Sequence, residues 1–172
     1  MRFKHVVLLP LALLVMLGAG CGQTTSDTVS NTASDAATSA VINAGLKGEG
    51  HVDVDQCTVN YQGKNGETMR YGDNVQLPED FPQDVKVYPQ AKIMIVNNST
   101  DGASLTAQTP DALDVTTHWY EEQYADWTKS TSTSSAGYEM RVFENDLVQI
   151  TVMISNSDNV TTVTMARTKK SS

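Results

Sequence analysis

The chain has 172 residues, with 20 acidic and 12 basic side chains and a formal net charge of −8. This length suffices for one domain with a hydrophobic core. An acidic chain without a cluster of Lys or Arg is a poor match for nucleic acid or for anionic lipid headgroups, so we expect no nucleic-acid partner. No motif typical of a cofactor site occurs, and we expect no cofactor.

Residues 1–20 have the pattern of a secretory signal. Arg2 and Lys4 precede an apolar run over Val6–Leu17, and three small residues follow it, Gly18 to Gly20. The run has only about a dozen residues, whereas a membrane-spanning helix needs about 20. The pattern predicts a signal peptide that is cleaved before Cys21.

The segment Leu17-Gly18-Ala19-Gly20-Cys21 resembles the lipobox of bacterial lipoproteins. The resemblance implies that the Cys21 thiol is acylated and becomes the first residue of the mature chain. Acyl chains on Cys21 would anchor the protein on the extracytoplasmic face of a membrane: the outer membrane in a Gram-negative cell, or the outer leaflet of the cell membrane in a Gram-positive one. The alternative is a disulfide between Cys21 and Cys57, the two cysteines of the chain. Cleavage takes away Arg2 and Lys4 and no acid, so the net charge falls from −8 to −10.

The segment 21–46 reads as the lipidated cysteine followed by a flexible tether. Residues 22–40 consist almost entirely of Ser, Thr, Ala, Asp and Asn, which bury too little apolar surface to offset the entropy of ordering. Residues 41–46, VINAGL, are transitional and are compatible with a short helical turn. Residues 47–75 predict a β-hairpin, because 51–61 alternate as in a strand, Asn65-Gly66 is a turn signal, and 68–72 read as the returning strand.

Residues 76–168 predict a domain of the α+β class. A proline-rich connector over 77–91 comes first, with Leu77, Phe81, Val85 and Val87 or Tyr88 as apolar pegs, and a hairpin of 91–98 and 103–109 follows. Thr109-Pro110 indicates the start of a helix over 110–127, whose buried face contains Leu113, Thr116 or Thr117, Tyr120, Tyr124 and Trp127. After a Ser/Thr loop at 130–137, three strands at 138–144, 147–155 and 160–168 form a meander. We therefore expect one helix packed across a mostly antiparallel sheet.

The stretch LPEDFPQDVKVYPQAK at 77–92, with the helix that contains Trp119-Tyr120 and ends near Trp127, resembles a family of small bacterial lipoproteins and secreted proteins. The recurring form of that segment is LPxDFPxDVxxYPxAK. The resemblance covers about residues 75–168 and implies no activity, since the family has none assigned.

Four candidate metal ligands occur at every second position in one predicted strand: His51, Asp53, Asp55 and Cys57. Alternate residues of a strand share a face but lie about 7 Å apart, so neighbours can share an ion and all four cannot. The alternative is that these side chains form a solvent-facing stripe. For Cys57 taken by itself, the alternative is a small buried apolar residue of its strand.

Trp119 and His118 are the candidate partner surface, because Trp119 lies about 100° around the helix from the predicted buried face. An exposed tryptophan binds sugar rings or protein partners, whereas a buried one would close the edge of the sheet.

No motif for nucleophilic catalysis is present, so we assign no catalytic residue. The sequence predicts a lipid-anchored, non-enzymatic binding or scaffolding protein of the cell envelope with an envelope protein or polysaccharide as partner; the alternatives are a hydrolase of envelope polymers and a metal-binding lipoprotein.

Overall fold

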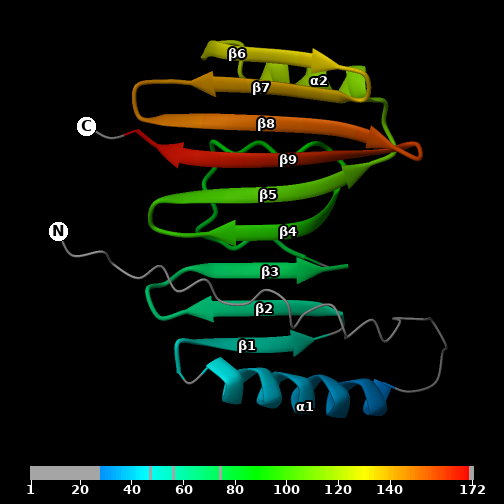
Figure 1. Ribbon diagram of the computed structural model, residues 1–172, viewed down its shortest axis with the longest axis vertical. Coiled ribbons are helices and arrows are strands. Elements are labelled where there is room, and N and C mark those ends of the chain that lie inside the picture. The colour runs from blue at the N-terminus through cyan, green and yellow to red at the C-terminus, as the bar shows by residue number, and fades with distance from the viewer. Residues whose placement is uncertain (1–27, 47, 56, 74, 171–172) are drawn as a thin grey trace.

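The structure, a computed structural model, describes residues 28–46, 48–55, 57–73 and 75–170. The described part is broadly α+β, with two helices and a nine-stranded antiparallel sheet (Figure 1). In the first part of the chain the elements are α1 (Thr28–Leu46), β1 (Gly50–Asp55), β2 (Thr58–Gly63), β3 (Thr68–Gly72), β4 (Lys92–Asn98) and β5 (Gly102–Thr109). They are followed by α2 (Leu113–Gln123), β6 (Thr128–Ser135), β7 (Tyr138–Glu144), β8 (Val148–Ser157) and β9 (Val160–Lys169).

The strand order is β1-β2-β3-β4-β5-β9-β8-β7-β6, so β1 and β6 are the two edges. Each of the eight neighbouring pairs is antiparallel. The last strand in sequence, β9, lies in the middle of the sheet between β5 and β8 (Figure 1). The predicted fold class is confirmed at this level, and so are the hairpin β4–β5 and the meander β7–β8–β9.

The hydrophobic core lies on one face of β4, β5 and β7–β9. Helix α2 and the segment 75–91, called the strap below, cover this face. Its members come from the strap, the sheet and α2, and they include Phe81, Val85, Tyr88, Leu105, Tyr120, Tyr124, Phe143, Ile150, Val152, Ile154, Val163 and Met165. Three of the predicted pegs, Phe81, Val85 and Tyr88, are buried, whereas Leu77 is exposed. The predicted helix face is confirmed as well, since Thr116, Thr117, Tyr120 and Tyr124 are all buried.

Strands β1 to β3 extend the sheet beyond this core, and we call them the wing. On the side that faces the core in the rest of the sheet, the wing has polar residues such as Asp53, Asn60 and Arg70. Its apolar residues lie on the opposite side, among them Val54, Val59, Tyr61, Met69 and Tyr71. The apolar side of the sheet therefore changes face between β3 and β4.

Helix α1 corrects the prediction of a flexible tether over 22–46, since 28–46 are helical. Three hydrogen bonds join α1 to the outer edge of β1. The Asn43 side chain accepts from Val52 N at 2.6 Å and donates to Val52 O at 2.7 Å, and Ser39 Oγ accepts from Val54 N at 2.9 Å. A helix that is poor in apolar residues is thus held by satisfying the backbone of an edge strand. Residues 22–27 of the predicted tether lie outside the described residues.

The predicted hairpin at 47–75 is a three-stranded unit, because the chain reverses between Asp55 and Thr58. Cys57 lies in this turn with φ of 67°. The close approach at the other side of the turn needs a glycine: a Cβ on Gly72 would lie 2.1 Å from the carbonyl oxygen of Cys57.

Two other boundaries differ from the sequence prediction. Helix α2 runs over Leu113–Gln123 and not over 110–127, and it follows an N-cap residue, Ala112, whose side chain makes no capping bond. Thr109 instead ends β5 opposite Thr161, and its hydroxyl accepts from Asp111 N at 3.2 Å. The Ser/Thr run predicted as a loop forms β6, an edge strand in which every residue is exposed.

Candidate functional site

The predicted lipid-attachment residue, Cys21, lies outside the described residues. Cys57 is disulfide-bonded in the structure. One sulfur atom cannot be both acylated and part of a disulfide, so an intrachain disulfide and acylation of Cys21 exclude each other. In the described residues, neither helix is both long and apolar enough to span a membrane.

The candidate metal ligands do not form a cluster. His51, Asp53 and Asp55 lie exposed along one face of β1. Cys57 is exposed in the turn that follows, which corrects its interpretation as a buried strand residue. Over the described residues, no group of three or more His, Cys, Asp and Glu is arranged to hold a metal ion. The arrangement matches the solvent-facing stripe that the sequence left as the alternative.

Trp119 and His118 do not form a joint exposed platform. Trp119 is half-buried and packs against the core, with its ring centroid 5.2 Å from that of Tyr88 and 4.8 Å from that of Tyr120, edge to face in both pairs. His118 is exposed, with Nε2 3.2 Å from a Glu122 oxygen one helical turn away. Trp119 therefore packs against the core, whereas the alternative in the sequence analysis was a buried tryptophan that closes the edge of the sheet.

The motif at 77–92 lies largely in the strap, and hydrogen bonds from the strap stabilise the fold. The Tyr124 hydroxyl donates to Asp84 O at 2.8 Å and accepts from Lys86 N at 3.1 Å, which fixes α2 to the strap. Both carboxylate oxygens of Asp84 accept from Arg167 Nε, at 2.8 and 2.9 Å, which fixes the strap to β9. Burial, foremost, raises the pKa of Tyr124 to about 12, so this hydroxyl stays protonated at neutral pH.

Tyr88 and Tyr120 are the two other tyrosines of the core cluster, and their hydroxyls differ in hydrogen bonding. The Tyr88 hydroxyl donates to Asp111 at 2.6 Å, and this bond raises the pKa of Tyr88. The Tyr120 hydroxyl has no hydrogen-bond partner in the described part of the chain, and burial raises its pKa. An unpaired buried hydroxyl costs free energy, so Tyr120 contributes through its ring.

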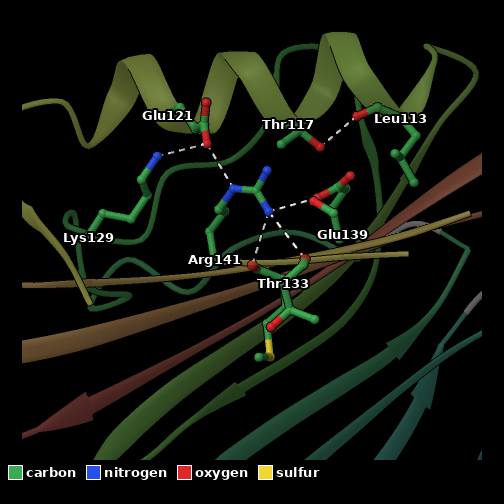
Figure 2. A network of polar contacts seen from close by, with 9 residues as sticks. Leu113, Thr117, Glu121, Lys129, Thr133, Glu139 and Arg141 are labelled. Carbon is green, nitrogen blue, oxygen red and sulfur yellow. Dashed lines mark hydrogen bonds and ion pairs between the residues drawn. The ribbon is translucent and has the colours of Figure 1, made fainter. Parts of the chain in front are cut away.

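A network around Arg141 joins α2 to the β6–β7 edge (Figure 2). Arg141 Nε donates to Glu121 at 2.8 Å, and Nη1 donates to Glu139 at 2.7 Å and to Thr133 O at 3.3 Å. Lys129 Nζ also lies 3.2 Å from Glu121, and Ser134 donates to Glu139. Figure 2 shows the guanidinium between the helix and the strands, with Glu121 reaching it from above.

This network holds charged carboxylates and is not an acid–base pair. The Arg141 hydrogen bond lowers the pKa of Glu121, and hydrogen bonds from Ser134 and Arg141 lower that of Glu139. The Lys170 ammonium, 2.8 Å away, lowers the pKa of Glu144. A glycosidase acid needs a raised pKa, so these three groups do not fit that role.

A shallow hollow lies on α1, lined by Ala37, Thr38, Val41 and Ile42. These described lining residues include no charged or titratable side chain, so they offer no chemistry for catalysis or metal binding.

The face of the sheet opposite the core has two central rows of residues, which sequence reasoning missed. Each row takes one residue from every strand, and neighbours in a row are paired across the sheet. From β6 to β1, the first row is Thr131, Val142, Thr151, Ala166, Ser104, Asn97, Met69, Tyr61 and Val52. The second row is Thr133, Met140, Met153, Thr164, Thr106, Ile95, Tyr71, Val59 and Val54.

No residue of these two rows is charged, and we call them the uncharged face. The chain as a whole is 19% charged, and about a quarter to a third of ordinary protein surface is charged. Most members of the two rows are partly exposed; Met69 is 37% and Tyr71 46% exposed. Thr106 and Thr164 contact each other through their hydroxyls at 3.3 Å in the middle of the sheet. In the sequence, these residues occupy alternate positions of each strand. Only the strand order shows that they lie side by side on one surface.

No protein-family profile matches the chain, and no curated protein or solved structure matches it either.

Proposed function

We propose that this protein is a lipid-anchored, extracytoplasmic binding or scaffolding protein of the bacterial cell envelope. The lipobox-like segment that ends at Cys21 supports the anchor. The proposed location is the outer membrane in a Gram-negative cell and the outer leaflet of the cell membrane in a Gram-positive one. The proposed partner is an envelope protein, with an envelope polysaccharide as the alternative.

The uncharged face is the observation that carries the binding role. Interfaces between proteins are enriched in Tyr and Met and depleted in Lys, Glu and Asp at their centres. The two rows contain Tyr61, Tyr71, Met69, Met140 and Met153 and no charge, within a mature chain of net charge −10. Water solvates charged side chains better than Met or Tyr, so a surface of this composition is better suited to contact with a partner than to solvent.

Helix α1 supports a position close to the membrane. Because α1 begins at Thr28 and binds the edge of β1, only residues 22–27 separate the acylated cysteine from the folded part. Six residues span at most about 20 Å. The uncharged face would then be presented near the membrane surface, where other anchored proteins are concentrated.

The anchor is tested by the intact mass of the protein from its native host, measured without reduction, and by partitioning into detergent. The expected result is a chain that begins at residue 21, has the added mass of acyl chains and enters the detergent phase, whereas Cys21→Ala does not. A chain without acyl mass that contains an intramolecular disulfide would contradict the anchor.

The binding role is tested by a photocrosslinking amino acid at position 71 in cells. Tyr71 is 46% exposed on the uncharged face, so the probe would reach a bound partner. The matched control is position 147, where Leu147 is 75% exposed outside the two rows. We expect a discrete crosslinked product from position 71 and none from position 147. Absence of any product from position 71 would contradict a binding role for this face.

A further inference from the structure

We infer that the partner on the uncharged face is a second copy of this chain, with two sheets stacked face to face. The inference rests on the proposed function, because it names the partner of the same surface. Two sheets that stack in this way lie about 10 Å apart with their side chains interdigitated. The result would be a symmetric dimer with one shared uncharged layer between the copies.

Charge disfavours a basic partner on this face and does not oppose a second copy there. Two mature chains of net charge −10 repel each other over most of their surfaces. The uncharged face is a surface through which they can meet without placing like charges opposite each other. A foreign basic partner would be attracted to acidic side chains, and these two rows contain none.

The size of the surface is that of a stable dimer interface. Nine strands spaced about 4.8 Å apart make the sheet about 40 Å wide, and two rows cover about 14 Å along the strands. A third row alongside is uncharged from Ser135 through Tyr138 and Thr162 to Gln108, and it ends at the charged Lys92 on β4. The total is about 700 Å² per copy, close to the roughly 800 Å² that each partner buries in a standard interface.

The wing supplies the apolar part of the contact. Met69 and Tyr71 on β3 lie beside Ile95 on β4, with Val59 and Tyr61 next to them on β2. In the wing these side chains face away from the side on which the core lies, so the core of a single copy cannot cover them. Partly exposed Tyr and Met at the centre of such a cluster are typical of residues that dominate binding energy.

The dimer is tested by sedimentation of the mature chain 21–172 with Cys21→Ala at about 1 to 100 µM, because interfaces of this size include ones of micromolar affinity. A reducing agent is present, so that the exposed Cys57 cannot join two copies through a disulfide. We expect concentration-dependent dimerisation that Tyr71→Lys weakens at least tenfold, because the new charge would have to be desolvated between the sheets. Thr133→Lys, at an exposed residue that ends the same row, is expected to weaken it as well without affecting the fold. Leu147→Lys adds the same charge outside the rows and should leave the dimer unchanged. Circular dichroism of each variant verifies that it is folded.

Three results would overturn the inference. One is a monomer throughout the concentration range. Another is a dimer that Tyr71→Lys and Thr133→Lys do not weaken, as expected if copies paired through the edge of β6. The third is a crosslinked product from position 71 with a mass other than that of two chains, which would refute the second copy and leave the proposed binding role in place.

Discussion

Tyr120 and Tyr124 are neighbours on the buried face of α2 and differ in what their hydroxyls contact. The Tyr124 hydroxyl bonds to two backbone groups of the strap, whereas that of Tyr120 has no partner in the described residues. We expect Tyr124→Phe to lower the free energy of unfolding by about 1–3 kcal/mol, because it leaves Lys86 N and Asp84 O unpaired. Tyr120→Phe should be neutral or stabilising, since it removes an unpaired hydroxyl. Urea denaturation of both variants measures this, and equal losses would contradict it.

The Arg141 network predicts a dependence of stability on pH. The pKa values of Glu121 and Glu139 lie below their ordinary value of about 4.5 in the folded chain. A lowered folded pKa contributes stability above the unfolded pKa, and that contribution is lost as the pH falls through the folded pKa. Glu121→Gln should therefore cost about 1 kcal/mol at pH 7 and progressively less between pH 5 and 3.

The measurement is the free energy of unfolding in urea at pH 7, 5 and 3. The control is Glu79→Gln, which alters an exposed residue of the strap outside the network. A cost of Glu121→Gln that stays constant down to pH 3 would show that packing, and not the ion pair, accounts for it.

Among the elements, α1 acts as a cover for an edge strand. Its Asn43 and Ser39 side chains bond to the outward-facing backbone of β1, while every residue of β6 at the other edge is exposed. In the double variant Ser39→Ala, Asn43→Ala we expect the amides of Val52 and Val54 to exchange with solvent roughly tenfold faster or more, because they lose their acceptors. Hydrogen exchange by NMR measures this. Val41→Ala, at a side chain 76% exposed on the same helix, should leave both amides unchanged.

The start of α2 offers a stabilising substitution. Ala112 has the extended backbone of an N-cap residue, with φ of −65° and ψ of 152°, but no side-chain oxygen to bond the first turn. Ala112→Ser should raise the free energy of unfolding by about 0.5–1 kcal/mol. Thermal and urea unfolding measure the gain. Ala125→Ser, just beyond the other end of the helix, is the control, and an equal effect there would point away from capping.

The elements that the sequence missed share a physical cause. Apolar periodicity predicted β7, β8, β9 and the buried face of α2, because those elements bury side chains against the core. Strand β6 buries none, so its Ser/Thr run contains no alternation to read. Helix α1 depends on tertiary hydrogen bonds from Asn43 and Ser39, which composition does not reveal. Thr109-Pro110 has the form of a helix start, but pairing of Thr109 with Thr161 keeps it in β5.

On the scale of the whole molecule, the sheet joins two parts of different construction. The main part has one face packed under α2 and the strap, and all the members of the core cluster lie in residues 75–165. The wing is joined to it through the pairing of β3 with β4. Backbone hydrogen bonds therefore continue across all nine strands, but the apolar packing of the core stops between β4 and β3. The uncharged face of the wing is consequently left for a partner.

This break in apolar packing predicts that the wing opens before the rest of the molecule. Local stability follows buried apolar contact, and within the described residues the core cluster includes none from α1, β1, β2 or β3. In native-state hydrogen exchange with low urea, the amides of β1 and β2 should exchange through a sub-global opening, while those of β8 and β9 exchange only with global unfolding. The experiment uses the Thr133→Lys variant, whose substitution lies in β6 and outside the wing, so that association through the uncharged face does not protect the wing. Equal opening free energies for β2 and β8 would show that the ladder between β3 and β4 makes the nine strands one cooperative unit.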